Sequence, residues 1–178
     1  MKTLLKISFL AFCFLAVSCT DDEKALDIEE YTGPLFESEN VEIMITDSTV
    51  VKIIMSGAKQ LQHQNGDIEF PQGIKVTFYD KFGEKISELT AQEGYKAADD
   101  NFYRARGDVH VQNLQKKETL STEELFWNPD DHEIYTDKFV TIETQDELIL
   151  AEGMRAPEDF STYELIRPQD SIFKLEEQ

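Results

Sequence analysis

The chain has 178 residues, and its 17 lysines and arginines against 36 aspartates and glutamates give a formal net charge of −19. A surface of this sign repels the phosphates of nucleic acids and of anionic lipids. We therefore expect no nucleic-acid binding, and any anionic amphiphile must be held by its apolar part. The length suits one domain with a substantial core.

Residues 1–18 have the layout of a bacterial lipoprotein signal peptide. Lys2 and Lys6 form a positive start, and residues 7–17 are an apolar run too short to span a bilayer. Small side chains then precede Cys19, which resembles a lipobox, where the cysteine thiol is acylated before cleavage. We predict lipidation at Cys19 and a membrane anchor made of acyl chains. A signal peptide that is cleaved without lipidation is the alternative.

Cleavage leaves a chain without a free thiol. Cys13 is lost with the signal and Cys19 is used for lipid, while the loss of Lys2 and Lys6 lowers the net charge to −21. No disulfide, thiol nucleophile or cysteine metal ligand then remains.

Residues 19–39 are acidic and poor in apolar side chains, and Gly33-Pro34 is a chain breaker. This composition predicts a flexible tether between the lipid and the domain. Residues 20–23 are interpreted as part of that solvated linker, with a membrane-sorting signal as the alternative.

Between residues 40 and 170, apolar and polar side chains alternate with a period of two, most clearly over residues 103–111. Turn signals separate these alternations, and Asn65-Gly66 is the strongest hairpin signal. We find no convincing helix after the signal, and residues 171–178 are interpreted as a C-terminal tail. The pattern predicts an all-β sandwich or open roll over residues 40–170.

A weak internal repeat relates residues 89–113 to residues 120–144. Each unit is predicted as two strands joined by an acidic turn. Such a unit buries one face only, so stacked copies must share an apolar interior. Gly107 and Lys138 occupy matching positions where an inward apolar side chain is expected, and glycine inside a strand marks a bulge or a sharp twist. We predict that both copies bend at this point.

No catalytic or metal-binding constellation is present. His63, His110 and His132 are scattered. Residues 130–133, beside Pro129, are interpreted as a solvated acidic turn, with a metal or catalytic role as the alternative. Neither a G-x-S-x-G elbow nor a phosphate-binding loop occurs. We therefore predict no enzymatic activity, no catalytic residues, no metal and no cofactor.

The inward-facing apolar side chains admit two interpretations. Either they fill a core, as in most β domains, or the roll stays partly open and they line a groove for an acyl chain. Periodicity does not separate the two. A tandem array of hairpins also leaves two free edges, which favour aggregation unless they are charged or paired with another protein.

The order and spacing of six segments carry a resemblance to a known family; they are residues 70–80, 103–111, 120–127, 134–142, Gly153 and residues 159–163. Together they resemble the LptC family, a periplasm-facing component of the lipopolysaccharide export (Lpt) ABC transporter system. The resemblance covers residues 41–166. Family members often carry an N-terminal transmembrane helix, whereas this chain has Cys19 in its place, as a lipoprotein-type variant.

The resemblance implies a twisted, open β-jellyroll of tandem antiparallel hairpins, of the OstA-like or LptA-like type, whose interior shields the acyl chains of lipid A. Such a protein accepts lipopolysaccharide from inner-membrane LptF/LptG-type permease subunits and passes it to an LptA-type periplasmic bridge protein. This transport serves cell-envelope biogenesis and outer-membrane assembly, and it implies a lipoprotein that faces the periplasm from the inner membrane. Mapped by strand parity, the groove lining comprises Tyr103, Val109, Val111, Trp127, Ile134, Val140 and Ile142.

Two alternatives stay open. The first is the periplasmic bridge protein of the same fold, which should be soluble and therefore fits poorly with an acylated Cys19. The second is a surface-exposed envelope lipoprotein that binds carbohydrate or acts as a scaffold, with residues 20–23 as its export signal.

Overall fold

The computed structural model describes residues 31–47, 49–169 and 171–173. The chain divides into two units, residues 1–32 and 33–178, and the fold described here is that of the second unit. The described ranges contain no helix, and so none that crosses a membrane. Their strands are β1 (Phe36–Asp47), β2 (Val50–Gln62), β3 (Ile68–Phe70), β4 (Ile74–Tyr79), β5 (Lys85–Ala91), β6 (Glu93–Lys96), β7 (Tyr103–Asn113), β8 (Glu118–Asn128), β9 (Glu133–Thr136), β10 (Val140–Glu143), β11 (Glu147–Pro157), β12 (Glu164–Pro168) and β13 (Ile172–Phe173).

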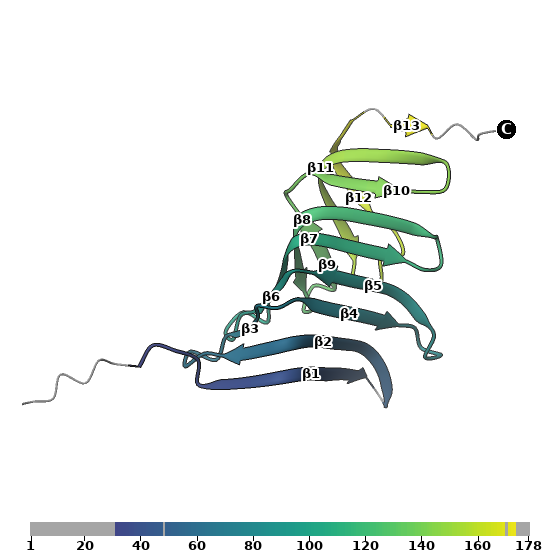
Figure 1. Ribbon diagram of the computed structural model, residues 1–178. Coiled ribbons are helices and arrows are strands. Elements are labelled where there is room, and N and C mark those ends of the chain that lie inside the picture. Colours follow the sequence, from purple (N-terminus) through teal and green to yellow (C-terminus); the bar gives the residue numbers. More distant parts are fainter. Residues whose placement is uncertain (1–30, 48, 170, 174–178) are drawn as a thin grey trace, which may run out of the picture. The chain divides into compact units, whose positions relative to one another are not determined.

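These strands form one 13-stranded sheet, in which neighbouring strands are antiparallel. The hairpins stack one on another, with β1 and β2 at one end of the stack and β10, β11 and β13 at the other (Figure 1). Alternation produces the buried face: in β4, Ile74, Val76 and Phe78 are buried whereas Lys75 is exposed. The predicted all-β jellyroll of tandem antiparallel hairpins is confirmed.

Two strands lie in segments that the sequence predicts as tether and tail. Strand β1 begins at Phe36, inside residues 19–39, and β13 lies inside residues 171–178. The side chains of residues 36–40 are all exposed, and the backbone pairs with β2, with Phe36 opposite Gln62. Apolar alternation does not reveal a strand of this kind, because backbone hydrogen bonds hold it rather than side-chain burial.

The sheet bends in the middle of its longer strands. Strand β7 pairs with β6 over residues 103–106 and with β5 over residues 110–113, and its register with β8 shifts between these two stretches. Gly107 lies at the shift, with a φ of 75°. In the second copy, Lys138 lies between the end of β9 and the start of β10. The predicted bend at Gly107 and Lys138 is confirmed.

The repeat corresponds to the same pairing made twice. Leu89 of β5 lies opposite Val111 of β7, and Leu120 of β8 lies opposite Ile142 of β10 in the same way. Each unit is therefore a bent hairpin that adds its apolar face to the same interior.

The bend divides the sheet into two halves. The first half contains β4, β5 and β10, the second contains β3, β6, β9 and β12, and β2, β7, β8 and β11 run through both. The halves approach closely at Gly94 of β6, where a Cβ would lie 2.7 Å from Cδ1 of Ile74 in β4. The apolar core lies between them and comprises Ile53, Met55, Phe70, Ile74, Val76, Phe78, Leu89, Ala105, Val109, Val111, Leu120, Leu125, Trp127, Ile134, Val140, Ile142, Ala151, Met154, Ala156 and Phe160.

A row of side chains in cation–π and ring contacts lies on the outer face of the second half. The guanidinium of Arg104 lies 5.2 Å from the ring centre of Tyr95, and that of Arg155 lies 5.3 Å from the ring centre of Tyr135. Phe126, opposite both Arg104 and Tyr135 in register, lies with its ring centre 5.3 Å from that of Tyr135. Cation–π and ring contacts thus involve side chains of five strands, β6, β7, β8, β9 and β11, on the side away from the core.

Candidate functional site

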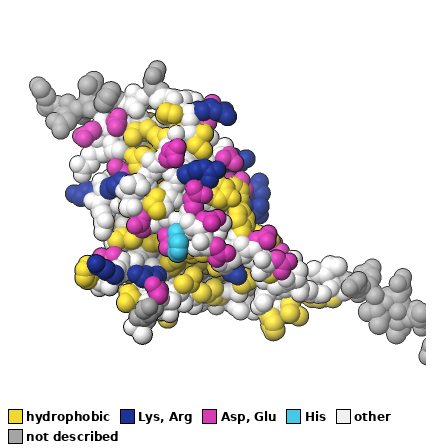
Figure 2. Space-filling view, turned by 180° about the vertical axis from the view of Figure 1, so that it is seen from behind, with side chains coloured by type: hydrophobic (Ala, Val, Ile, Leu, Met, Phe, Trp, Pro, Cys, Tyr) yellow, Lys and Arg dark blue, Asp and Glu magenta, His cyan; other side chains and the backbone are white. Residues whose placement is uncertain are grey.

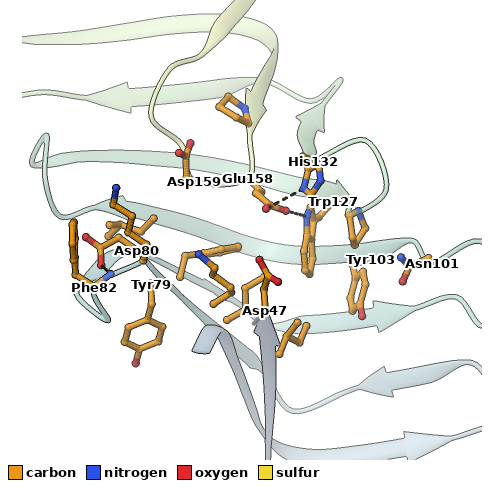
Figure 3. Close-up of a pocket in the computed structure, with 18 residues that line it drawn as sticks. Asp47, Tyr79, Asp80, Phe82, Asn101, Tyr103, Trp127, His132, Glu158 and Asp159 are labelled. Carbon is orange, nitrogen blue, oxygen red and sulfur yellow. Dashed lines mark hydrogen bonds and ion pairs between the residues drawn. The ribbon is translucent and has the colours of Figure 1, made fainter. Parts of the chain in front are cut away.

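An open cavity of about 900 Å³ lies beside the core. Residues of β1, β2, β7 and β8, the end of β4 with the turn after it, and the turns at residues 129–132 and 157–159 form its walls (Figure 3). Three of these segments are turns that are far apart in the chain. The cavity therefore exists only because the folded sheet brings them together.

The floor of the cavity is apolar and mostly aromatic. Phe78 and Trp127 are 4% and 8% exposed, and their rings make an edge-to-face contact with centres 6.2 Å apart. Tyr103 lies against Trp127 with ring centres 4.6 Å apart, and Ile53 adds an aliphatic surface. Burial raises the pKa of the Tyr103 phenol above its ordinary value, so this side chain stays neutral. The floor therefore offers apolar contact without charge.

The rim of the cavity is charged and predominantly acidic. Asp80 closes the turn after β4, where its Oδ1 accepts hydrogen bonds from the backbone N–H groups of Phe82 and Glu84. Acidic side chains are also spread among apolar patches on the face that Figure 2 shows. This arrangement keeps anionic groups of a ligand away from the protein and leaves the floor to hold its apolar part. The charged rim residues are Asp47, Lys52, Asp80, Lys81, Glu158 and Asp159.

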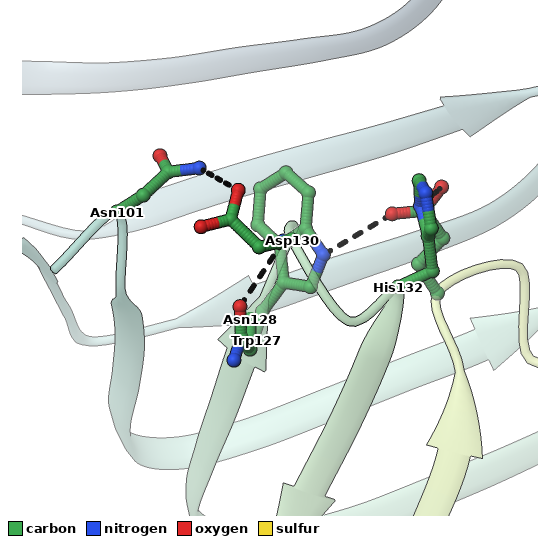
Figure 4. A network of polar contacts seen from close by, with 6 residues as sticks. Asn101, Trp127, Asn128, Asp130 and His132 are labelled. Carbon is green, nitrogen blue, oxygen red and sulfur yellow. Dashed lines mark hydrogen bonds and ion pairs between the residues drawn. The ribbon is translucent and has the colours of Figure 1, made fainter.

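Glu158 joins two walls of the cavity. Its Oε2 accepts a hydrogen bond from the indole Nε1 of Trp127 at 3.3 Å, and its Oε1 lies 3.2 Å from Nδ1 of His132 (Figures 3 and 4). Asp130 holds the turn that carries His132. Its backbone N–H donates a hydrogen bond to Asn128 Oδ1, and its carboxylate accepts one from the side-chain amide of Asn101. Hydrogen bonds between turns thus fix the position of the indole ring.

A second, much smaller cavity of about 40 Å³ lies further inside the sheet. It shares Phe78, Tyr103 and Trp127 with the large cavity, and the rest of its wall is mainly core side chains such as Leu125 and Ile134. The three shared aromatic rings therefore separate the outer cavity from the inner one.

The structure divides the predicted groove residues into two groups. Tyr103 and Trp127 line both cavities, and Ile134 lines the inner one. Val109, Val111, Val140 and Ile142 are at most 2% exposed and lie in the core, away from both cavity linings. Strand parity placed all seven on the inward face. Contact of these seven side chains with a lipid stays a prediction.

Sequence reasoning did not identify several cavity residues. Ile53 and Phe78 belong to recognisable alternations in β2 and β4, so parity marks them as inward-facing, but nothing in those strands distinguishes cavity from core. Glu158 lies just after β11, and its contacts with Trp127 and His132 span sequence separations of 31 and 26 residues. No local pattern predicts such contacts.

Cys19 and the signal peptide lie outside the described residues. Within residues 31–47, 49–169 and 171–173, no group of three histidine, cysteine or acidic side chains is arranged to hold a metal ion. The acidic turn at residues 130–133 makes the turn-closing contacts described above.

Comparison with known proteins gives one family. Residues 3–168 match the family model described as LptC: Lipopolysaccharide-assembly, LptC-related. No curated protein matches the chain.

Proposed function

This chain belongs to the LptC family of lipopolysaccharide-assembly proteins, and we propose that it is a non-enzymatic carrier that accepts lipopolysaccharide from the inner-membrane ABC transporter and passes it to a periplasmic bridge protein. Membership implies a role in lipopolysaccharide transport and an association with the envelope that faces the periplasm. We propose in addition how the protein binds lipopolysaccharide and how it hands it over.

The observation that carries the proposal is the aromatic cavity floor beneath an acidic rim. A lipid tail against Phe78, Trp127 and Ile53 gains about 0.8 kcal/mol for each methylene removed from water. The rim carboxylates, such as Asp80 and Asp159, repel the phosphates of the same molecule and leave them in solvent. The site therefore selects an amphiphile by its tail, as a carrier of lipid A must.

Exposed edge strands at both ends of the sheet support a position of this protein between two partner proteins. At one end, β1 has β2 as its one strand partner among the described residues, and it exposes Met44 at 59%. At the other end, β12 and β13 both pair with β11, and the part of the chain that the structure describes adds no further strand beside them. Exposed strands recruit other strands through backbone hydrogen bonds. We propose that one end receives the LptF/LptG-type permease and the other an LptA-type bridge.

The anchor in the proposal is acylated Cys19, which would tether the domain to the inner membrane through the residues before β1. Replacing Cys19 by Ala is expected to release the protein from the membrane fraction, because no acyl chain is then attached. An unchanged membrane fraction would contradict the anchor but not the cavity.

Photo-crosslinking in cells tests the lipid site. A benzophenone amino acid at Tyr103, which faces the cavity, is expected to capture lipopolysaccharide. The same group at Arg106, on the opposite face of β7, is the matched control and is expected to capture none. The pair Val111 and His110 repeats the comparison deeper in the sheet. Equal capture at Tyr103 and Arg106, or none at Tyr103 and Val111, would refute lipid binding on the inner face.

A further inference from the structure

We infer that Trp127 is a movable partition between the outer and inner cavities and that Glu158 is the positioning residue that latches it closed. This inference rests on the proposed binding of acyl chains. It adds the point at which the path of an acyl chain is blocked, and the hydrogen bond that controls the block.

The first reason is the size of the inner cavity. Its volume of about 40 Å³ accommodates little more than one water molecule. An acyl chain that enters the outer cavity therefore stops at the rings of Phe78, Tyr103 and Trp127, which the two cavities share. It continues past Leu125 and Ile134 only when one of these rings moves.

The second reason is that the three rings are held differently. Phe78 is packed edge-to-face between Trp127 and Phe160, with ring centres 6.2 Å away on both sides. Tyr103 is held between the ring of Trp127 and the ammonium of Lys96, which lies 5.6 Å from its ring centre. The indole of Trp127 has a polar attachment as well, its Nε1 hydrogen bond to Glu158.

The third reason is that this attachment can be released without opening the sheet. Glu158 is carried by the turn after β11, and its backbone N–H donates to the carbonyl of His132 in another turn. Its side chain is 34% exposed, so water competes for the carboxylate. Breaking the bond between Trp127 and Glu158 costs no strand pairing. The indole then keeps its ring contacts with Phe78 and Tyr103 but has lost the attachment that opposes its rotation toward the open cavity.

Trp127 is the one tryptophan of the protein, so the fluorescence of its indole reports directly on the partition. The probes are two long saturated fatty acids that carry bromine, a collisional quencher of indole fluorescence, either near the methyl end or in the middle of the chain. In the wild-type protein the tail stops at the indole, so the methyl-end probe quenches more strongly. In Glu158→Ala the tail passes the ring, and the mid-chain probe is expected to quench severalfold more, relative to the methyl-end probe, than in wild type.

Two matched variants separate the latch from a change of charge. Glu158→Gln keeps an acceptor oxygen for the indole N–H and is expected to give the wild-type ratio of quenching. Glu123→Ala removes an exposed carboxylate of β8 that lines neither cavity, and it is also expected to give the wild-type ratio. The latch is refuted if Glu158→Ala leaves the ratio unchanged, or if either control shifts it as far.

His132→Ala is an independent test of the same latch, which applies even if Glu158→Ala does not fold. His132→Ala removes the other partner of the carboxylate at a side chain that is 74% exposed, and it is expected to shift the ratio in the same direction by a smaller factor. No shift in His132→Ala would contradict the latch. Quenching that is present but identical in all variants rejects the partition and leaves the proposed lipid site standing, whereas no quenching in any protein rejects both.

Discussion

Asn113 holds one side of the structure together, and its replacement by Ala is expected to be costly. It is 8% exposed at the end of β7. Its Oδ1 accepts the backbone N–H groups of Gln115 and Lys116 at 3.0 and 2.9 Å, and its Nδ2 donates to the carbonyl of Phe160 at 3.0 Å. One amide therefore closes the β7–β8 turn and ties the loop after β11 to the core.

The expected loss follows from these three hydrogen bonds. Each contributes about 0.5–1.5 kcal/mol net, and the Phe160 carbonyl would be left without its partner inside the protein. Asn113→Ala should thus lower the free energy of unfolding by about 2–4 kcal/mol. At roughly 2–4 °C per kcal/mol for a chain of this size, the melting temperature should fall by about 5–15 °C.

Urea unfolding followed by Trp127 fluorescence measures this loss, because the indole is buried in the folded state. Asn113→Ser is the matched variant. Its hydroxyl can still accept from the turn N–H groups but is too short to reach Phe160, so it should recover about half of the loss. A loss below about 1 kcal/mol for Asn113→Ala would refute the reasoning, as would a serine variant no more stable than the alanine variant.

Three further predictions concern other parts of the sheet. Gly153→Ala places a Cβ 2.8 Å from the Thr136 carbonyl oxygen, and because backbone cannot move aside we expect a loss of about 1–3 kcal/mol in thermal unfolding. The pKa of Asp67 in the folded protein is lowered chiefly by the hydrogen bond from the Tyr95 hydroxyl. Asp67 therefore stabilises the fold at pH values above the ordinary carboxyl pKa. This stabilisation is lost as the pH falls through the lower pKa of the folded state. Asp67→Asn should flatten the acid side of a plot of urea midpoint against pH, and an unchanged slope would contradict this. Arg104→Lys keeps the charge but loses the flat contact with the Tyr95 ring, so a double-mutant cycle with Tyr95→Leu should give a coupling of about 0.5–1 kcal/mol.

The hairpin turns show why the repeat could be read from sequence. The turn after residue 113 and the turn after residue 144 are closed in the same way. Thr144 Oγ1 accepts the backbone N–H groups of Asp146 and Glu147, as Asn113 does for the residues at the matching positions. Contacts between residues two or three positions apart depend on local sequence, and so does the alternation of side chains along a strand.

Local patterns accordingly determined most of the strands, the inward face, the repeat and the bend at Gly107, but not the start of β1 or strand β13. They did not separate Tyr103 and Trp127, which line the cavities, from Val109 and Val111, which fill the core. All four have the same parity, because parity records which face a side chain is on and not what lies opposite it.

The tertiary structure decided what lies opposite. The inward face of the longer strands is covered by the facing half of the sheet, whereas beside Trp127 the turns at residues 129–132 and 157–159 leave a cavity open to solvent. Glu158 reaches the indole across 31 residues of sequence. The sequence by itself therefore determined that this protein is a stack of bent hairpins with an apolar interior. Only the folded sheet determined where that interior opens, because the opening depends on turns that local sequence does not bring together.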